Sequence, residues 1–336
     1  MDHTKSDQKI IVIAPVKDEE WILERFLWAC SQFADHIILL NQQSTDRTVE
    51  IIGDFEKAMV FNNPSPVYDE AYRTEFLVGK VRELYGLGNL IIALDADEIP
   101  TYPSLNIRLW ESLKRQPLGT TIVFSKPDLL SQPMRYLPAP TNFPLAYVDD
   151  GADTEKKLIH NRRIPGTASG PQYVCSSIIV LHFARVRQSE YFARQAMYCV
   201  IENVNRSKNL RLRTLYYSRQ SFLKKDREAG VVVPDEWSRG YLEQGIDLYG
   251  YRTDPYNEFH RKVLEHFEEH GTKRFWMDDI WWEDWQAAAA YFCKAKKMNN
   301  SRLALPNASF NACRGIFVSC SFMLSAMRAS LRKLMS

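Results

Sequence analysis

The sequence predicts an α/β protein with a doubly wound, mainly parallel sheet and a helical part at its carboxyl end. Short apolar runs alternate with amphipathic segments over residues 10–94. Apolar runs of this length are typical of strands that are buried on both faces. The alternation favours right-handed crossovers and a parallel sheet. From about residue 206 the chain becomes basic and aromatic, with a mainly helical pattern.

The first half alternates strand and helix without a break. Asp18, Glu19 and Glu20 open the first predicted helix, where acidic side chains favour the positive end of the helix dipole. Gly86 and Gly88 end the third. The predicted strands cover residues 10–14, 36–40, 59–61 and 90–94, and the helices between them cover residues 18–33, 49–55 and 70–85.

The second half is less regular. Residues 126–172 are rich in Pro, Asp and Gly and are expected to form a long irregular region, of the kind that often serves as a lid or a binding loop. The elements expected around it are a helix at 105–115, strands at 121–124 and 173–183, and a helix at 189–205. The predicted division of the chain is 1–205 for the α/β part, 206–300 for a helical, aromatic-rich part, and 301–336 for a basic amphipathic tail.

Composition narrows the class of protein. The chain has 336 residues, 45% hydrophobic and 25% charged, with a formal net charge of +2. That charge argues against a nucleic-acid binder, which needs a strongly basic face. The six cysteines form no C-x-x-C pair, and a reducing compartment is expected. The amino end is polar and no uncharged stretch is long enough to span a bilayer, so we expect a cytoplasmic protein.

An acidic motif follows the fourth predicted strand. Residues 90–94 are apolar and run directly into Asp95, Ala96, Asp97 and Glu98. Open α/β sheets bind their ligands at the carboxyl ends of such strands. Two carboxylates that converge without a basic partner repel each other unless a hard cation, Mg²⁺ or Mn²⁺, lies between them. The alternative is a solvated acidic turn.

Three blocks in this order resemble family-2-type glycosyltransferases. They are residues 12–19, 39–48 and 93–98, and the similarity covers roughly residues 8–200. Bacterial members that begin with a Val-Lys-Asn-Glu-like segment resemble the chain most. The resemblance implies a GT-A fold, a Rossmann-like mixed sheet. It assigns nucleotide-sugar binding and catalysis to residues 1–205 and the acceptor side to residues 206–300. It also implies a metal-dependent transfer of a sugar from a nucleotide sugar, expected to be a UDP-sugar, to a glycan or lipid-linked saccharide in surface polysaccharide synthesis.

The resemblance also implies a metal site. Asp97 is the first expected ligand of Mn²⁺ or Mg²⁺, and Asp95 is expected to bind the metal, a metal-bound water or the ribose. His182, at the end of another predicted strand, fits as a third ligand, because imidazole is acceptable to Mn²⁺. Arg185 lies close to it in sequence and is expected to contact the nucleotide. The alternative for His182 is a buried histidine of the core.

The nucleoside base is expected at the first loop. The resemblance places it near the backbone of Pro15 and Val16 and beside Glu19. Gln42 stands where the family usually has an aspartate, and its amide can both donate and accept a hydrogen bond. Arg73 matches a basic residue that reaches the nucleotide. A solvated helix arginine is an equal alternative.

The catalytic base is expected between the acidic motif and His182, where an inverting transfer needs a carboxylate close to the acceptor hydroxyl. Asp150 is the candidate chosen from the four acids there. A charged, solvated loop is the commoner explanation of such a run, and a retaining mechanism without a base stays open.

Two segments of the carboxyl half each have two possible interpretations. Residues 275–285 contain four tryptophans, which either stack on an acceptor sugar or pack a helix onto the body. Residues 301–336 contain five basic residues and no acid, with an apolar stripe. Such a segment is typical of an interfacial helix on anionic lipid. We therefore expect peripheral contact of residues 307–336 with the inner face of a membrane; docking on the domain or on a second subunit is the alternative.

Other classes of protein remain possible. An apolar strand that ends in Asp-x-Asp also opens haloacid-dehalogenase-type phosphatases, with Asp95 as the nucleophile. Three predicted strand–helix units precede it here, which is unusual for those enzymes. A sugar-nucleotide-binding protein without activity is a further alternative. A nucleotidyltransferase needs a glycine-rich loop after the first strand, and residues 15–19 contain no glycine.

Overall fold

The structure is a computed structural model. It describes residues 8–65, 67–130, 135–138, 142–157, 161–167, 169–218, 230–251, 255–294 and 303–334. The chain forms two compact units: the first comprises residues 1–186 and 230–252, and the second residues 187–229 and 253–336. The three-part division expected from the sequence stays a prediction.

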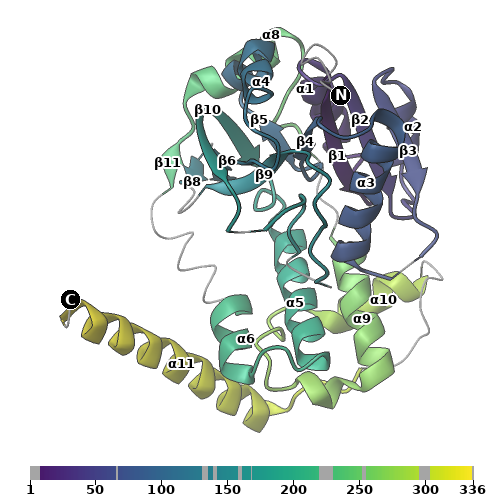
Figure 1. Cartoon of the computed structure of the whole chain (residues 1–336). Helices are drawn as coiled ribbons and strands as arrows, with labels where there is room; N and C mark the ends of the chain where they lie inside the picture. The colour runs from purple at the N-terminus through teal and green to yellow at the C-terminus, as the bar shows by residue number, and fades with distance from the viewer. Residues whose placement is uncertain are drawn as a thin grey trace. The chain divides into compact units, whose positions relative to one another are not determined.

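Four parallel strands form one side of the sheet of the first unit (Figure 1). β3 (Ala58–Asn62), β2 (His36–Asn41), β1 (Ile10–Val16) and β4 (Leu90–Ala93) lie in that order. Their side chains are almost all buried in β1, β2 and β4, as expected for strands covered on both faces. All four strands were expected from their apolar runs.

Helices cover both faces of these strands. Alternate residues of β1 point to opposite faces, so Ile10 and Val12 belong to one hydrophobic cluster and Ile11 and Ile13 to another. The first cluster includes side chains of α1 (Leu23–Ser31) and α2 (Thr48–Gly53), and the second includes those of α3 (Glu70–Tyr85). The result is a three-layer α/β/α arrangement.

The other side of the sheet contains antiparallel strands that the sequence analysis missed. β9 (Phe143–Val148) lies between β4 and β6 (Thr121–Ser125) and is antiparallel to both. The expectation of an irregular region over residues 126–172 is therefore wrong at this strand. Pro144 disguises it, because proline is rare inside central strands; here it lies at an irregularity of the β6–β9 register.

The remaining strands extend the sheet beyond β6. β10 (Gln172–His182) is parallel to β6 and antiparallel to β5 (Glu98–Pro100). The other short elements of this unit are β7 (Asp128–Leu129), β8 (Arg135–Leu137), β11 (Val231–Val232), α4 (Ile107–Leu113), α8 (Arg239–Glu243), η1 (Tyr102–Leu105) and η2 (Asp235–Trp237). The predicted fold class, a mixed, mainly parallel α/β sheet with a helical carboxyl part, is confirmed. The GT-A type that the resemblance implies stays a prediction.

The described residues of the second unit form helices. They are α5 (Gln188–Val204), α6 (Leu210–Tyr217), α9 (Glu258–His270), η3 (Thr272–Phe275), α10 (Trp285–Lys294) and α11 (Ala308–Leu334). Residues 308–330 of α11 form a 23-residue segment of mean hydropathy 1.2, long and apolar enough to cross a membrane by length and composition alone. The segment contains the charged residues Arg314 and Arg328. It therefore differs from the long uncharged stretch for which the sequence was searched above. Arg302, at the start of the expected tail, lies outside the described residues.

Candidate active site

The acidic motif lies in the turn between β4 and β5, at the carboxyl edge of the parallel strands. Pairing of β5 with β10 places His182 opposite Glu98. The backbone N–H of Phe183 donates to the carbonyl oxygen of Asp97 over 2.8 Å. These backbone contacts bring two predicted ligands, Asp97 and His182, to neighbouring strand ends.

Their side chains face each other. Nε2 of His182 lies 3.8 Å from Oδ2 of Asp97, and Nδ1 of His182 lies 2.7 Å from Oδ1 of Asp128. Burial by itself raises the pKa of Asp128, but the hydrogen bond and charge of His182, together with the charge of Arg185, outweigh burial and lower it to about 2. The ionised Asp128 can only accept, so Nδ1 carries the hydrogen and Nε2 is left free to bind a cation.

The Asp97–His182 pair fits one divalent cation. Ligand atoms about 2.1 Å from a cation can lie up to about 4.2 Å apart. The separation of 3.8 Å falls inside that limit. An oxygen from carboxylate and a nitrogen from imidazole, with a carboxylate behind the imidazole, form a donor set suited to Mn²⁺.

A buried cluster of charged side chains supports the turn between β4 and β5. Glu98 is fully buried, and its carboxylate accepts hydrogen bonds from Nζ of Lys126 at 2.6 Å and from Nη1 of Arg163 at 2.8 Å. Burial alone raises the pKa of Glu98, but the charges of Arg163 and Lys126 outweigh it and lower the pKa strongly. Glu98 also accepts the backbone N–H of Asp95 at 3.0 Å, which holds the turn in shape.

Asp95 has a basic partner that the sequence analysis did not foresee. Its Oδ2 lies 2.8 Å from Nη1 of Arg163, which reaches it from the long loop after β9. The expectation that the two aspartates converge without a basic partner is therefore wrong for Asp95. Arg163 lies 65 residues from Glu98 in the chain, and no local pattern marks it. The guanidinium and a cation would compete for the same carboxylate.

The polar loops after β1 and β2 are joined by side-chain hydrogen bonds. The backbone N–H of Glu19 donates to Oγ1 of Thr48 at 2.8 Å, and the indole N–H of Trp21 donates to Oε2 of Glu19 at 2.8 Å. Asp18 and Gln43 adopt positive φ angles of 53° and 59°. This strained geometry is uncommon outside glycine and is concentrated at functional loops.

Gln42 and Arg73, two of the predicted nucleotide contacts, lie together. Oε1 of Gln42 accepts from Nε of Arg73 at 3.1 Å, and the guanidinium lies 4.2 Å from the ring centroid of Tyr68. The carbonyl oxygen of Val16 accepts the backbone N–H of Gln42 at 2.8 Å. Pro15 and Val16 are therefore the last residues of β1 beside this group, although the side chain of Val16 is buried.

Asp150 lies at the opposite edge of the sheet, and its proposed role as catalytic base is corrected. β9 is antiparallel to β4, so Val148 pairs with Leu90 at the amino end of β4. Asp150 follows that end, whereas Asp95 follows the carboxyl end. The carboxylate of Asp150 accepts the hydroxyl of Tyr147 at 2.7 Å and the backbone N–H of Ala152 at 2.9 Å. Its contacts indicate a structural role.

Arg185 is nearly buried and pairs with Asp128. Its Nε lies 3.2 Å from Oδ2 of Asp128, on the carboxylate that also binds His182. The expected contact of Arg185 with a nucleotide stays a prediction. Asp128 is, with Arg163, a residue that sequence reasoning missed. It begins β7, shortly after the end of β6, and that place was the available signal.

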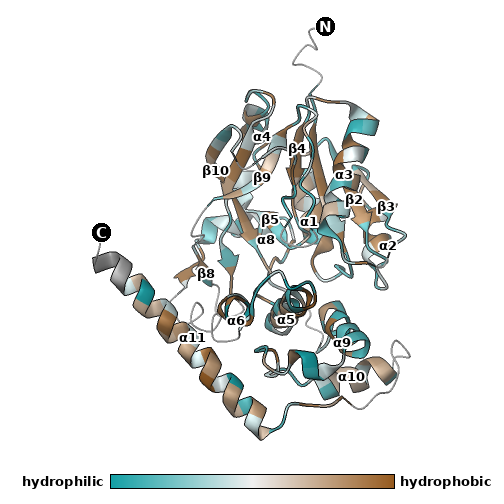
Figure 2. Ribbon diagram, turned by 60° about the horizontal axis from the view of Figure 1, so that its bottom comes forward, coloured by the Kyte–Doolittle hydropathy of each residue, from teal (hydrophilic) through white to brown (hydrophobic). Residues whose placement is uncertain are grey.

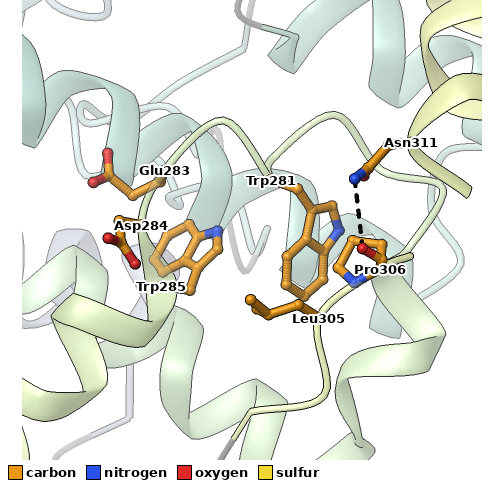
Figure 3. A pocket seen from close by; sticks show the side chains of 7 residues that line it. All are labelled: Trp281, Glu283, Asp284, Trp285, Leu305, Pro306 and Asn311. Atoms are coloured by element: carbon orange, nitrogen blue, oxygen red, sulfur yellow. Dashed lines mark hydrogen bonds between the residues drawn. The ribbon is translucent and has the colours of Figure 1, made fainter. Parts of the chain in front are cut away.

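The tryptophan-rich segment belongs to the second unit and packs within it. Trp285 is 1% exposed, and Trp281 stacks on Phe267 with ring centroids 5.2 Å apart. Figure 3 shows both indoles at a small pocket of about 130 Å³. Its lining residues are Trp281, Glu283, Asp284, Trp285, Leu305, Pro306 and Asn311. These contacts support the packing alternative for Trp285.

Comparison with known proteins finds likeness in solved structures only. No family model and no curated protein matches the chain. GalNAc-T7 with UDP, GalNAc and Mn²⁺ is similar over 73% of this chain and 59% of its own, with a TM-score of 0.39 and 12% identity. HddC from Yersinia pseudotuberculosis is similar over 52% of this chain and 93% of its own, with a TM-score of 0.33 and 8% identity. A 4-diphosphocytidyl-2C-methyl-D-erythritol synthase is similar over 42% and 74%, with a TM-score of 0.31 and 14% identity. At these scores the likenesses carry no argument about chemistry, which depends on the site itself.

Proposed function

We propose that this chain is a metal-dependent glycosyltransferase that transfers a sugar from a nucleotide sugar to a glycan or lipid-linked acceptor. The observation that carries the proposal is the 3.8 Å approach of Nε2 of His182 to Oδ2 of Asp97, with Asp128 on the other ring nitrogen. This group lies at the edge of a parallel sheet where α/β proteins bind nucleotides.

Asp97 and His182 are proposed to hold Mn²⁺ or Mg²⁺. When bound, the cation neutralises charge that develops on the diphosphate leaving group. Asp128 keeps the imidazole in the tautomer that binds the cation. Glu98 holds Arg163 beside Asp95, where the guanidinium adds positive charge on the side at which the diphosphate is expected.

The nucleoside is proposed to lie on the loops after β1 and β2. Oε1 of Gln42 accepts from Arg73 and Asn63 and fixes the amide in place. The guanidinium of Arg73 lies there over the ring of Tyr68. Glu19, on the first of these loops, carries a carboxylate that accepts the indole N–H of Trp21. A UDP-sugar is the proposed donor, and surface polysaccharide synthesis at the inner face of a membrane is the proposed setting.

Nucleotide binding tests the metal site directly. We would measure the affinity for UDP by calorimetry, with and without Mn²⁺, for the wild type, Asp97→Asn and the matched control Asp150→Asn. Asp97→Asn is expected to lose most of the Mn²⁺-dependent affinity, by about tenfold or more. The control changes the same residue type at the opposite edge of the sheet and should keep it.

Turnover separates the alternatives. Release of UDP from UDP-sugars in the presence of Mn²⁺ supports the transferase. Binding without any turnover favours a binding protein, and hydrolysis of a phosphate monoester that Asp95→Asn abolishes favours a phosphatase. Unchanged Mn²⁺-dependent UDP binding in Asp97→Asn would overturn the proposed metal site.

A further inference from the structure

Helix α11 covers one face and exposes another that carries large apolar side chains. Arg314, Val318 and Ser321, spaced as one face of a helix, are 9%, 7% and 3% exposed. Nη1 of Arg314 donates to the carbonyl oxygen of Trp276 at 3.0 Å, and Nε lies 3.9 Å from Oδ1 of Asp279. A charged side chain therefore attaches this face of the helix to the rest of the second unit.

The opposite face of α11 carries large apolar side chains that are exposed to solvent. Ile316, Met323 and Met327 are 65%, 62% and 60% exposed, and Cys320 between them is also exposed. We call these four residues the apolar stripe. Figure 2 shows the hydrophobic colour along much of α11. A helix of a water-soluble domain buries its apolar stripe, so this exposed stripe indicates an apolar partner.

The charge of residues 301–336 identifies the class of partner that covers the apolar stripe. Residues 301–336 carry five basic residues and no acid. Arg314 faces the rest of the second unit, which leaves four for an external partner: Arg302, Arg328, Arg332 and Lys333. An anionic bilayer offers an apolar interior beneath a negative surface, which complements such a segment. A second copy of this helix would bring the same positive charges and repel.

We propose that α11 lies in the plane of an anionic membrane, with the apolar stripe inserted at the boundary of headgroups and acyl chains. The helix is long enough to span, but its Arg314 face is covered by protein, so lipid cannot surround it. Arg328 is exposed one turn after Leu324 and is placed to reach lipid phosphates. The proposal concerns attachment and stands independently of the reaction.

Vesicle sedimentation tests the stripe. The full chain is mixed with vesicles of phosphatidylcholine containing phosphatidylglycerol, and with phosphatidylcholine alone. Ile316→Gln with Met323→Gln removes apolar surface without changing charge, and is expected to weaken binding to the anionic vesicles about tenfold or more. The control, Ala326→Gln with Ala329→Gln, alters two exposed alanines of the same helix and should bind within about twofold of the wild type.

The salt dependence of vesicle binding and the extraction of bound protein from membranes complete the test. Binding of the wild type should fall as salt rises and should be absent on neutral vesicles, because the attraction of basic residues is screened. Equal binding by the stripe variant, or equal binding to neutral vesicles, would overturn the proposal. Membrane protein that resists extraction at alkaline pH would indicate a span, and a wild-type dimer that the stripe variant dissociates would indicate self-association. Circular dichroism checks that each variant stays folded.

Discussion

Nδ1 of His182 lies 2.7 Å from Oδ1 of Asp128, and this contact determines which ring nitrogen faces Asp97. Because the carboxylate can only accept, Nδ1 carries the hydrogen of this contact, and in the neutral imidazole the lone pair is on Nε2, the nitrogen 3.8 Å from Asp97. Arg185 binds the other oxygen of Asp128 and restricts its rotation. The geometry at the candidate metal site thus depends on a residue that would not touch the metal.

Replacement of Asp128 is expected to weaken Mn²⁺ binding without unfolding the protein. Asp128→Ala removes the acceptor that orients His182, and loss of such a partner typically costs 10- to 100-fold in metal affinity, so we expect a fall of roughly that size. Asp128→Asn should recover part of the affinity, since its amide oxygen still accepts from Nδ1. Titration with Mn²⁺ measures both, with the exposed Asp54→Ala as control. Equal affinity in all variants would contradict the role of Asp128.

Low pH should remove the contribution that the Asp128–His182 pair makes to the free energy of unfolding. The pKa of Asp128 is lowered from an ordinary 3.8 to about 2 in the folded protein. A carboxyl group with a lowered folded pKa stabilises above its ordinary pKa and loses that contribution as pH falls through the folded value. The side chain is 35% exposed, so solvent screening limits the contribution to about 1 kcal/mol. The free energy of unfolding of wild type and Asp128→Asn should differ at pH 6 and converge near pH 2. A difference that persists at pH 2 would contradict this assignment.

The buried carboxylate of Glu98 is expected to be important for stability. Glu98→Gln leaves Lys126 and Arg163 without their shared negative charge, and removal of one partner of a buried pair costs about 3 kcal/mol. Urea unfolding measures this loss. The matched control is Glu83→Gln, whose ion pair with Lys80 is 61% exposed on the acidic side and should contribute under about 0.5 kcal/mol. Similar losses for both variants would show that the cluster around Glu98 is not a stabilising centre.

The parallel half of the fold could be predicted because its signals are local. Apolar runs of four to five residues, separated by amphipathic helices, locate β1, β2 and β4. The carboxyl edge of such strands is where ligands bind. Asp97 and His182 follow from the same rule, since Asp97 lies in the turn after β4 and His182 ends β10. The pairing that brings them to 3.8 Å is long-range and could be expected only from the resemblance.

The antiparallel half and its consequences could not be predicted in the same way. Pro144 hides β9, and the direction of that strand decides at which edge Asp150 lies. Nothing local in the sequence fixes a strand direction after an irregular loop. Arg163 likewise reaches Asp95 through tertiary structure alone, from a loop without a helical or strand period.

Arg163 supplies the last prediction, because it occupies the carboxylate that a cation would use. Its Nη1 lies 2.8 Å from Oδ2 of Asp95 and 2.8 Å from Oε2 of Glu98. Arg163→Gln is expected to release Asp95 and to strengthen Mn²⁺ binding in the absence of nucleotide, while UDP binding weakens because positive charge near the diphosphate is lost. Calorimetric titrations with Mn²⁺ alone, and with UDP at saturating Mn²⁺, separate the two effects. Arg162→Gln is the control: this arginine neighbours Arg163 in the chain but donates to Thr121, so it should change neither affinity. If Mn²⁺ binds more weakly to Arg163→Gln than to the wild type, the guanidinium supports the cation site and does not compete with it.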